Sequence, residues 1–147
     1  MTASTTAGAP ATIASRLAAR PVWQVCYLAG LAACVPVEIY GLIARAAGIP
    51  MRAAGFGSHT AGSITVGMFA MGVMVITFWF TFATVLIARF ARKPARVYVR
   101  TALALLVLSV AVPLSAADTA TSTKLMLAGA HLIAAAVIIP VVARRLR

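Results

Sequence analysis

The stretch that decides the fold is residues 101–143, TALALLVLSVAVPLSAADTATSTKLMLAGAHLIAAAVIIPVVA, in which two apolar runs flank one short polar segment. The polar segment, residues 118–124, begins with Asp118, ends with Lys124 and is otherwise rich in threonine. The two apolar runs, 101–117 and 125–143, are close to the roughly 20 residues that a helix needs to cross the hydrocarbon core of a bilayer. The pattern predicts a helical hairpin inside a membrane.

Two further apolar runs precede this hairpin. Residues 22–44 form one, interrupted by Pro36 and Glu38, and residues 61–88 form the other. A glycine-rich connector, 46–60, and a basic loop, 89–100, separate the runs. Small residues are frequent in every run, and they let membrane helices approach closely. We therefore expect an all-α fold: a flexible tail at 1–20, followed by a single four-helix transmembrane bundle at 21–147.

Composition supports a membrane protein over a soluble one. Hydrophobic residues make up 63% of the chain and charged residues only 10%, whereas charged residues make up about a quarter of a soluble protein. The formal net charge of +11 would suggest nucleic acid as a partner of a soluble protein. Here the basic residues flank apolar runs, so the predicted partners are the lipid bilayer and its anionic headgroups, and no nucleic acid.

The distribution of basic residues predicts the orientation. Four spans place both termini on one side of the membrane. That side carries ten arginines and lysines: Arg16, Arg20, Arg89, Arg92, Lys93, Arg96, Arg100, Arg144, Arg145 and Arg147. The other side carries three: Arg45, Arg52 and Lys124. Because cytoplasmic loops are enriched in Lys and Arg, we expect a multi-pass protein of the inner (plasma) membrane with both termini in the cytoplasm.

Two ionisable residues are predicted inside the membrane at one depth. Glu38 near the outer end of the first span and His131 near the outer start of the fourth both lie about 9–10 Å below the outer boundary, at 1.5 Å per residue. His59 and Asp118 belong to the outer rim above them. A charged side chain in hydrocarbon costs about 2.5–3.5 kcal/mol, so Glu38 should face the bundle interior and have a partner. His131 is one candidate, and Arg45 competes with it.

Three interpretations of these polar residues remain open. The first is a structural contact of Glu38 that fixes helix register; the second is a proton-responsive or ion-coupled site of Glu38 and His131. The third is a metal or catalytic site that adds His59 and Asp118, although no metal-ligand spacing is present. Cys26 and Cys34 lie about 12 Å apart on one helix, too far for a disulfide. No motif indicates a metal or cofactor, and neither is expected.

These alternatives lead to different function classes. The favoured class is a non-enzymatic membrane protein, such as an accessory or assembly subunit, with a second copy or another membrane protein as its partner. The alternative is a proton-coupled small-molecule transporter that uses Glu38. The least favoured class is a metal-dependent or lipid-modifying membrane enzyme, which would need ligands from at least three helices.

The C-terminal part of the chain resembles a known kind of family. Residues 109–146 carry the resemblance, through Pro113-Leu114-Ser115, the threonine-rich turn, His131-Leu132 and Val137-Ile138-Ile139-Pro140. They resemble an uncharacterised family of small four-helix membrane proteins of high-GC Gram-positive bacteria, a domain of unknown function. The resemblance implies the bundle and carries the histidine of the fourth span over onto His131, and it implies no activity.

A second, looser likeness is architectural. Small multidrug-resistance transporters are also short four-helix proteins with one essential glutamate in the first helix. Glu38 would take that place here, although the residues around it do not match the motif of those transporters. This likeness is the reason for keeping the transporter as the alternative.

Overall fold

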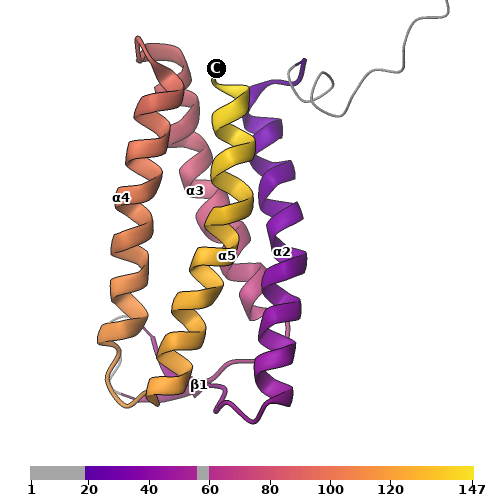
Figure 1. Cartoon of the computed structure of the whole chain (residues 1–147), viewed down its shortest axis with the longest axis vertical. Coiled ribbons are helices and arrows are strands. Elements are labelled where there is room, and N and C mark those ends of the chain that lie inside the picture. The colour runs from indigo at the N-terminus through magenta and orange to yellow at the C-terminus, as the bar shows by residue number, and fades with distance from the viewer. Residues whose placement is uncertain (1–18, 56–59) are drawn as a thin grey trace, which may run out of the picture.

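A computed structural model describes residues 19–55 and 60–147, and shows an antiparallel four-helix bundle (Figure 1). The elements, in chain order, are α2 (Val22–Ala46), β1 (Arg52–Ala54), β2 (Ala61–Ser63), α3 (Met68–Phe90), α4 (Pro94–Ser115) and α5 (Thr121–Arg145). The predicted all-α four-helix fold is therefore confirmed. The start of α2, the α3–α4 connection and the end of α5 lie together at one end of the bundle.

All four helices have the length and composition of membrane spans. They contain 22 to 25 residues each, which corresponds to about 33–38 Å at 1.5 Å per residue and exceeds the roughly 30 Å hydrocarbon core. Helices suit this solvent because each one satisfies its own backbone hydrogen bonds. The chain is thus a multi-pass membrane protein.

Two helix starts differ by seven residues from the spans expected from the sequence, and the other boundaries that differ do so by two to four residues. The second helix begins at Met68 and not at residue 61, because residues 61–63 form β2, which pairs antiparallel with β1 in the register Ala53 to Gly62. The third begins at Pro94, seven residues before the expected start at 101. Proline suits the first position of a helix, where its missing amide hydrogen is not needed. Apolar content alone therefore located the spans without fixing their ends.

The helices pack unequally. α2 packs against both α3 and α5, whereas α4 packs mainly on α5 and little on α3. The buried side chains form two clusters, which share α2 and α5. The cluster around Tyr98 and Val142 includes α4, and the cluster around Val37 and Met126 includes α3 but not α4. α3 contributes to both ends of the core, because its Phe80, Ile87 and Ala88 pack against the Tyr98 cluster, whereas α4 belongs to the Tyr98 cluster.

Glycines set the closest approaches between helices. A Cβ atom added at Gly30 of α2 would lie 2.6 Å from Thr77 Oγ1 of α3, and one at Gly41 would lie 2.7 Å from the Phe69 ring. A Cβ added at Gly129 of α5 would lie 2.6 Å from the Tyr40 hydroxyl oxygen of α2. Small residues at helix interfaces permit this close packing. Gly30, Gly41 and Gly129 thus fix how α2 sits against α3 and α5.

Candidate functional site

Glu38 of α2 binds the N-terminus of α3. Its Oε1 accepts a hydrogen bond from the Gly67 amide at 2.6 Å, and its Oε2 accepts one from the Ala70 amide at 3.1 Å. The first turn of a helix has amides without intrahelical partners, and its partial positive charge favours an anionic group. The carboxylate of one membrane helix therefore supplies the acceptors that the next helix lacks.

The sequence at the start of α3 explains why an outside acceptor is needed. Gly67 is the N-cap residue, with φ of 90°, and no side-chain hydrogen bond of the cap residue itself closes the helix. A serine, threonine or aspartate at this position would accept from the amide two or three residues on. Glu38 makes that contact with Ala70, the third residue of the helix, from a different part of the chain.

Neither of the partners expected for Glu38 is among those it has in the structure. His131 Nδ1 lies 2.7 Å from the Leu127 carbonyl oxygen of its own helix. Arg45 donates through a terminal guanidinium nitrogen to the Ile64 carbonyl oxygen at 2.7 Å. Tyr40, two residues after Glu38, contacts Gly129, two residues before His131, so α2 and α5 are neighbours in this region. The Glu38 carboxylate turns toward the start of α3 and accepts from its amides there.

Asp118, which the sequence predicts at the outer rim, belongs to a group of contacts that join the β-strands to the α4–α5 turn. Asp118, with φ of 45°, accepts from the Ala61 amide at 3.4 Å. Thr119 Oγ1 accepts from the Ala54 amide at 3.0 Å, and the fully buried Thr123 donates to the Pro50 carbonyl oxygen. We call this end of the bundle, with β1, β2 and residues 116–120, the hairpin end. His59 lies outside the described residues.

The polar residues do not form a metal site within the described part of the chain. In residues 19–55 and 60–147, no three side chains of His, Cys, Asp or Glu come together in an arrangement that could hold a metal ion. Glu38, His131 and Asp118 instead each contact backbone groups, as described above.

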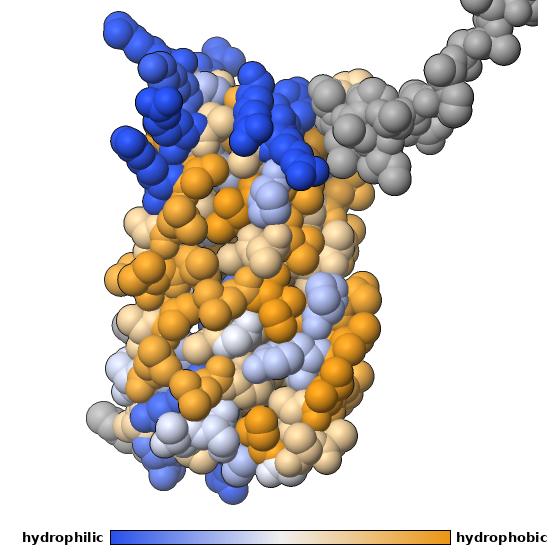
Figure 2. All heavy atoms as spheres, in the orientation of Figure 1, coloured by the Kyte–Doolittle hydropathy of each residue, from blue (hydrophilic) through white to orange (hydrophobic). Residues whose placement is uncertain are grey.

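The opposite end of the bundle, here called the basic end, is strongly cationic (Figure 2). Its described arginines and lysines are Arg20, Arg89, Arg92, Lys93, Arg96, Arg100, Arg144, Arg145 and Arg147. Both acidic residues of the chain, Glu38 and Asp118, contact groups toward the hairpin end. Figure 2 shows the apolar belt that begins below the basic end. The basic end therefore lacks any side-chain carboxylate of its own.

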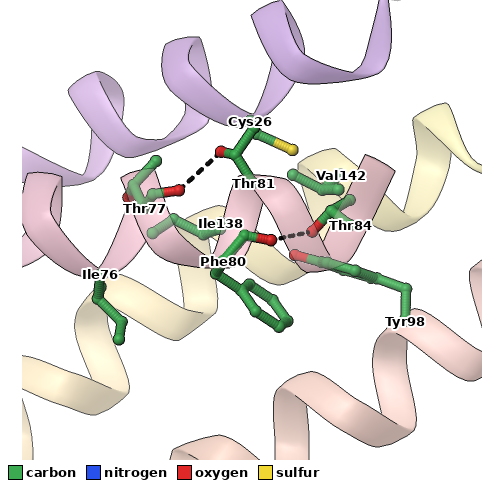
Figure 3. Close-up of a pocket in the computed structure, with 9 residues that line it drawn as sticks. All are labelled: Cys26, Ile76, Thr77, Phe80, Thr81, Thr84, Tyr98, Ile138 and Val142. Atoms are coloured by element: carbon green, nitrogen blue, oxygen red, sulfur yellow. Dashed lines mark hydrogen bonds between the residues drawn. The ribbon is translucent and has the colours of Figure 1, made fainter. Parts of the chain in front are cut away.

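A small cavity lies between the helices, in the half of the bundle nearer the basic end (Figure 3). Its volume is about 50 Å³, and all four helices contribute to its lining. Besides apolar side chains, it is lined by Cys26, Thr77, Thr81, Thr84 and Tyr98. The three threonines lie along one face of α3, and Tyr98 points its hydroxyl from α4 toward Thr84.

No residue of this cavity is among those that the sequence predicted for a site. The sequence does carry a signal for it: Thr77, Thr81 and Thr84 recur at helical spacing in an otherwise apolar span, so they share one face of the helix. The sequence offered no reason to expect Tyr98 in a cavity, because it lies in the basic loop predicted at 89–100. The structure instead places Tyr98 in the second turn of α4, where it is fully buried.

A small four-helix bundle with a cationic end and an apolar belt defines the class of this protein as a multi-pass integral membrane protein. Within that class, a family of unknown function, DUF6069, matches residues 17–147, and the chain belongs to that family. The expected membership in an uncharacterised domain family is thereby confirmed. No curated protein and no solved structure matches the chain.

Proposed function

We propose that the protein is a non-enzymatic component of the plasma membrane that binds anionic phospholipid headgroups at its basic end, in the cytoplasmic leaflet, and serves as an accessory or assembly subunit beside another membrane protein. The observation that carries the proposal is the separation of charge along the bundle. Nine described cations gather at one end, and both carboxylate side chains of the chain are engaged toward the other.

The basic end fits an anionic surface. Five of its cations, Arg89, Arg92, Lys93, Arg96 and Arg100, lie within or beside the short α3–α4 connection, and three more follow at the C-terminus. Each Lys or Arg near an anionic membrane surface contributes about 1 kcal/mol of attraction. Because the chain has no carboxylate side chain at this end, headgroup phosphates are the natural counter-ions.

The contacts of Glu38 support a structural role over a catalytic or transport role. Both of its oxygens already accept hydrogen bonds from amides that have no intrahelical partner. A contact of this kind explains a glutamate in an apolar span without assigning it a proton or a substrate. The alternative, a proton-coupled transporter, requires Glu38 to leave these amides during each transport cycle.

The position of Trp79 supports a contact with another protein in the plane of the membrane. It lies 11 residues from either end of α3, and its side chain is 67% exposed. Its ring packs edge to face on Phe78, with centroids 5.4 Å apart. Tryptophan is enriched at membrane interfaces, where its indole N–H finds polar partners, so an exposed indole in the middle of a span is better covered by protein than by acyl chains.

The headgroup proposal is tested by the stability of the purified protein in mixed micelles. Phosphatidylglycerol should raise the midpoint of unfolding more than phosphatidylcholine does, and 0.5 M salt should reduce the difference. Replacing Arg96 and Arg100 together by glutamine should reduce the phosphatidylglycerol effect. The matched control replaces Arg52 and Lys124, which removes two charges from the hairpin end. Equal effects of the two lipids, or equal losses in both double variants, would contradict the proposal.

The accessory role and the transporter are separated by Glu38→Gln. The accessory role predicts that this variant inserts, folds and keeps its membrane partner. A transporter predicts instead that the variant inserts normally but loses proton-dependent uptake in vesicles. An uptake activity of the unaltered protein that disappears in the variant would replace the accessory proposal by the transporter.

A further inference from the structure

We propose that the cavity between the four helices is a site for bound water, where a small group of water molecules pairs with the hydroxyls of Thr77 and Tyr98 and joins α4 to α3. This inference is independent of the role proposed for the basic end. It depends on three properties of the cavity: its size, its buried hydroxyls and the absence of charged side chains from its lining.

The hydroxyls provide the first argument. Thr77 Oγ1 and the Tyr98 hydroxyl oxygen are buried, and neither has a hydrogen-bond partner among the described protein groups. Thr77 is 5% exposed and Tyr98 is 0% exposed. A buried hydroxyl without a partner is costly, and nearly all such groups in proteins are paired with protein or with ordered water. Both hydroxyls belong to residues that line the same cavity.

The volume provides the second argument. The cavity measures about 50 Å³, and a buried water molecule needs roughly 10–15 Å³ of such space together with two to four polar partners. About three water molecules therefore fit. A larger organic ligand does not fit without movement of the helices.

The few polar groups in the otherwise apolar wall of this partly open cavity are neutral and can both donate and accept. Thr81 donates its hydroxyl proton to the Thr77 carbonyl oxygen at 2.6 Å, and Thr84 donates to the Phe80 carbonyl oxygen at 2.8 Å (Figure 3). Their hydroxyl oxygens keep lone pairs that can accept, while Thr77 and Tyr98 can donate. None of the nine lining residues is charged. Water meets these requirements, whereas an ion would lack a compensating charge.

The position of Tyr98 gives the bound water a structural role. Tyr98 is a fully buried side chain of α4, which packs little on α3. Its ring contacts Phe80 of α3, with ring centroids 5.6 Å apart. Water between the Tyr98 hydroxyl and the α3 threonines adds a polar connection where direct helix packing is sparse. In lipid, such polar contacts help to hold helices together.

The direct test is water-edited solid-state NMR of the unaltered, isotopically labelled protein in phosphatidylcholine and phosphatidylglycerol bilayers. Magnetisation from water should reach the Thr77 methyl group and the Tyr98 ring faster than it reaches the apolar Val37, which is also buried but lies away from the cavity. Transfer to Thr77 and Tyr98 that is as slow as transfer to Val37 would overturn the proposal. This measurement needs no variant, so it does not depend on a substitution that could prevent folding.

A second measurement uses Tyr98→Phe, which removes only the hydroxyl. If water pairs with Tyr98, the variant should unfold at a lower midpoint, because the bound water loses a partner. If the hydroxyl is unpaired in a dry cavity, the midpoint should rise or stay unchanged, which would count against the proposal. Tyr27→Phe is the matched control: it makes the same change on a half-buried tyrosine outside the cavity lining and should leave the midpoint unchanged.

Discussion

Glu38 and Gly67 are joined by a hydrogen bond of 2.6 Å from the Gly67 amide to Oε1 of the glutamate, across 29 positions of sequence. This contact, with the second one to Ala70, links the C-terminal half of α2 to the first turn of α3. A charged residue within an apolar span thereby becomes part of the connection between two helices. Its consequences can be measured on the folded protein.

The first prediction concerns the strength of this contact. Glu38→Ala should destabilise the protein by about 1–2 kcal/mol, because the amides of the exposed Gly67 and the half-buried Ala70 lose their acceptor at the start of α3. Glu38→Gln should cost about 1 kcal/mol, because its amide oxygen can still accept one of the two hydrogen bonds. Denaturation by detergent, followed by circular dichroism, measures both.

Asp118→Asn is the matched acid-to-amide control for these variants. Asp118 is exposed and makes a longer contact, 3.4 Å to the Ala61 amide, so its change should cost less than about 0.5 kcal/mol. If Glu38→Gln and Asp118→Asn lower the free energy of unfolding equally, the α2–α3 contact contributes no more to stability than an exposed contact does.

The second prediction is that Glu38 and His131 are energetically independent. Their side chains bind different groups, the α3 amides and the Leu127 carbonyl oxygen. The effects of Glu38→Gln and His131→Ala on stability should add to within about 0.5 kcal/mol in a double-mutant cycle. A larger coupling energy would revive the interpretation of the two residues as one proton-responsive site.

The third prediction concerns the close helix contacts. Gly30→Ala should destabilise the protein by about 1–3 kcal/mol, because its Cβ would lie 2.6 Å and 2.7 Å from Oγ1 and Cγ2 of the buried Thr77. Gly72→Ala is the control, since nothing lies within 4 Å of the added Cβ. That change should be neutral or stabilise by up to about 1 kcal/mol, through the higher helix propensity of alanine. Similar unfolding midpoints for the two variants would contradict the α2–α3 packing.

The fourth prediction concerns depth in the membrane. The chain has two tryptophans, so Trp23→Phe leaves Trp79 as the only tryptophan fluorophore. Lying 11 residues from either end of α3, Trp79 should be quenched most by lipids brominated near the ends of their acyl chains. The quenching should weaken as the protein-to-lipid ratio rises if a second copy covers the indole. Strongest quenching by bromine near the headgroups would place Trp79 away from the membrane centre.

The fifth prediction concerns orientation. In a background with Cys26 and Cys34 replaced by alanine, a cysteine is introduced either at Ser63 of the hairpin end or at Lys93 of the basic end. Because basic residues favour the cytoplasm, a membrane-impermeant maleimide should label the Ser63→Cys variant on intact cells. The Lys93→Cys variant should react only after permeabilisation. The reverse pattern would place the basic end outside.

The sequence by itself determined the number and approximate location of the membrane helices. Four apolar runs of suitable length have few other stable forms in a bilayer, because every backbone amide and carbonyl must be paired within the segment. The clustering of cations at one end also follows directly from the order of the runs. These properties depend on local composition, so they can be predicted from the sequence without knowledge of the tertiary structure.

Only the tertiary structure decided which groups meet. The partner of Glu38 is a pair of backbone amides, and amides occur at nearly every position, so no residue type marked Gly67 and Ala70 as its partners. The start of α3 depends on the pairing of β2 with β1, and the cavity depends on how Tyr98 of α4 meets the threonines of α3. Depth along a helix can be counted from the sequence, but the direction in which a side chain points is set by how the helices rotate and pack against one another.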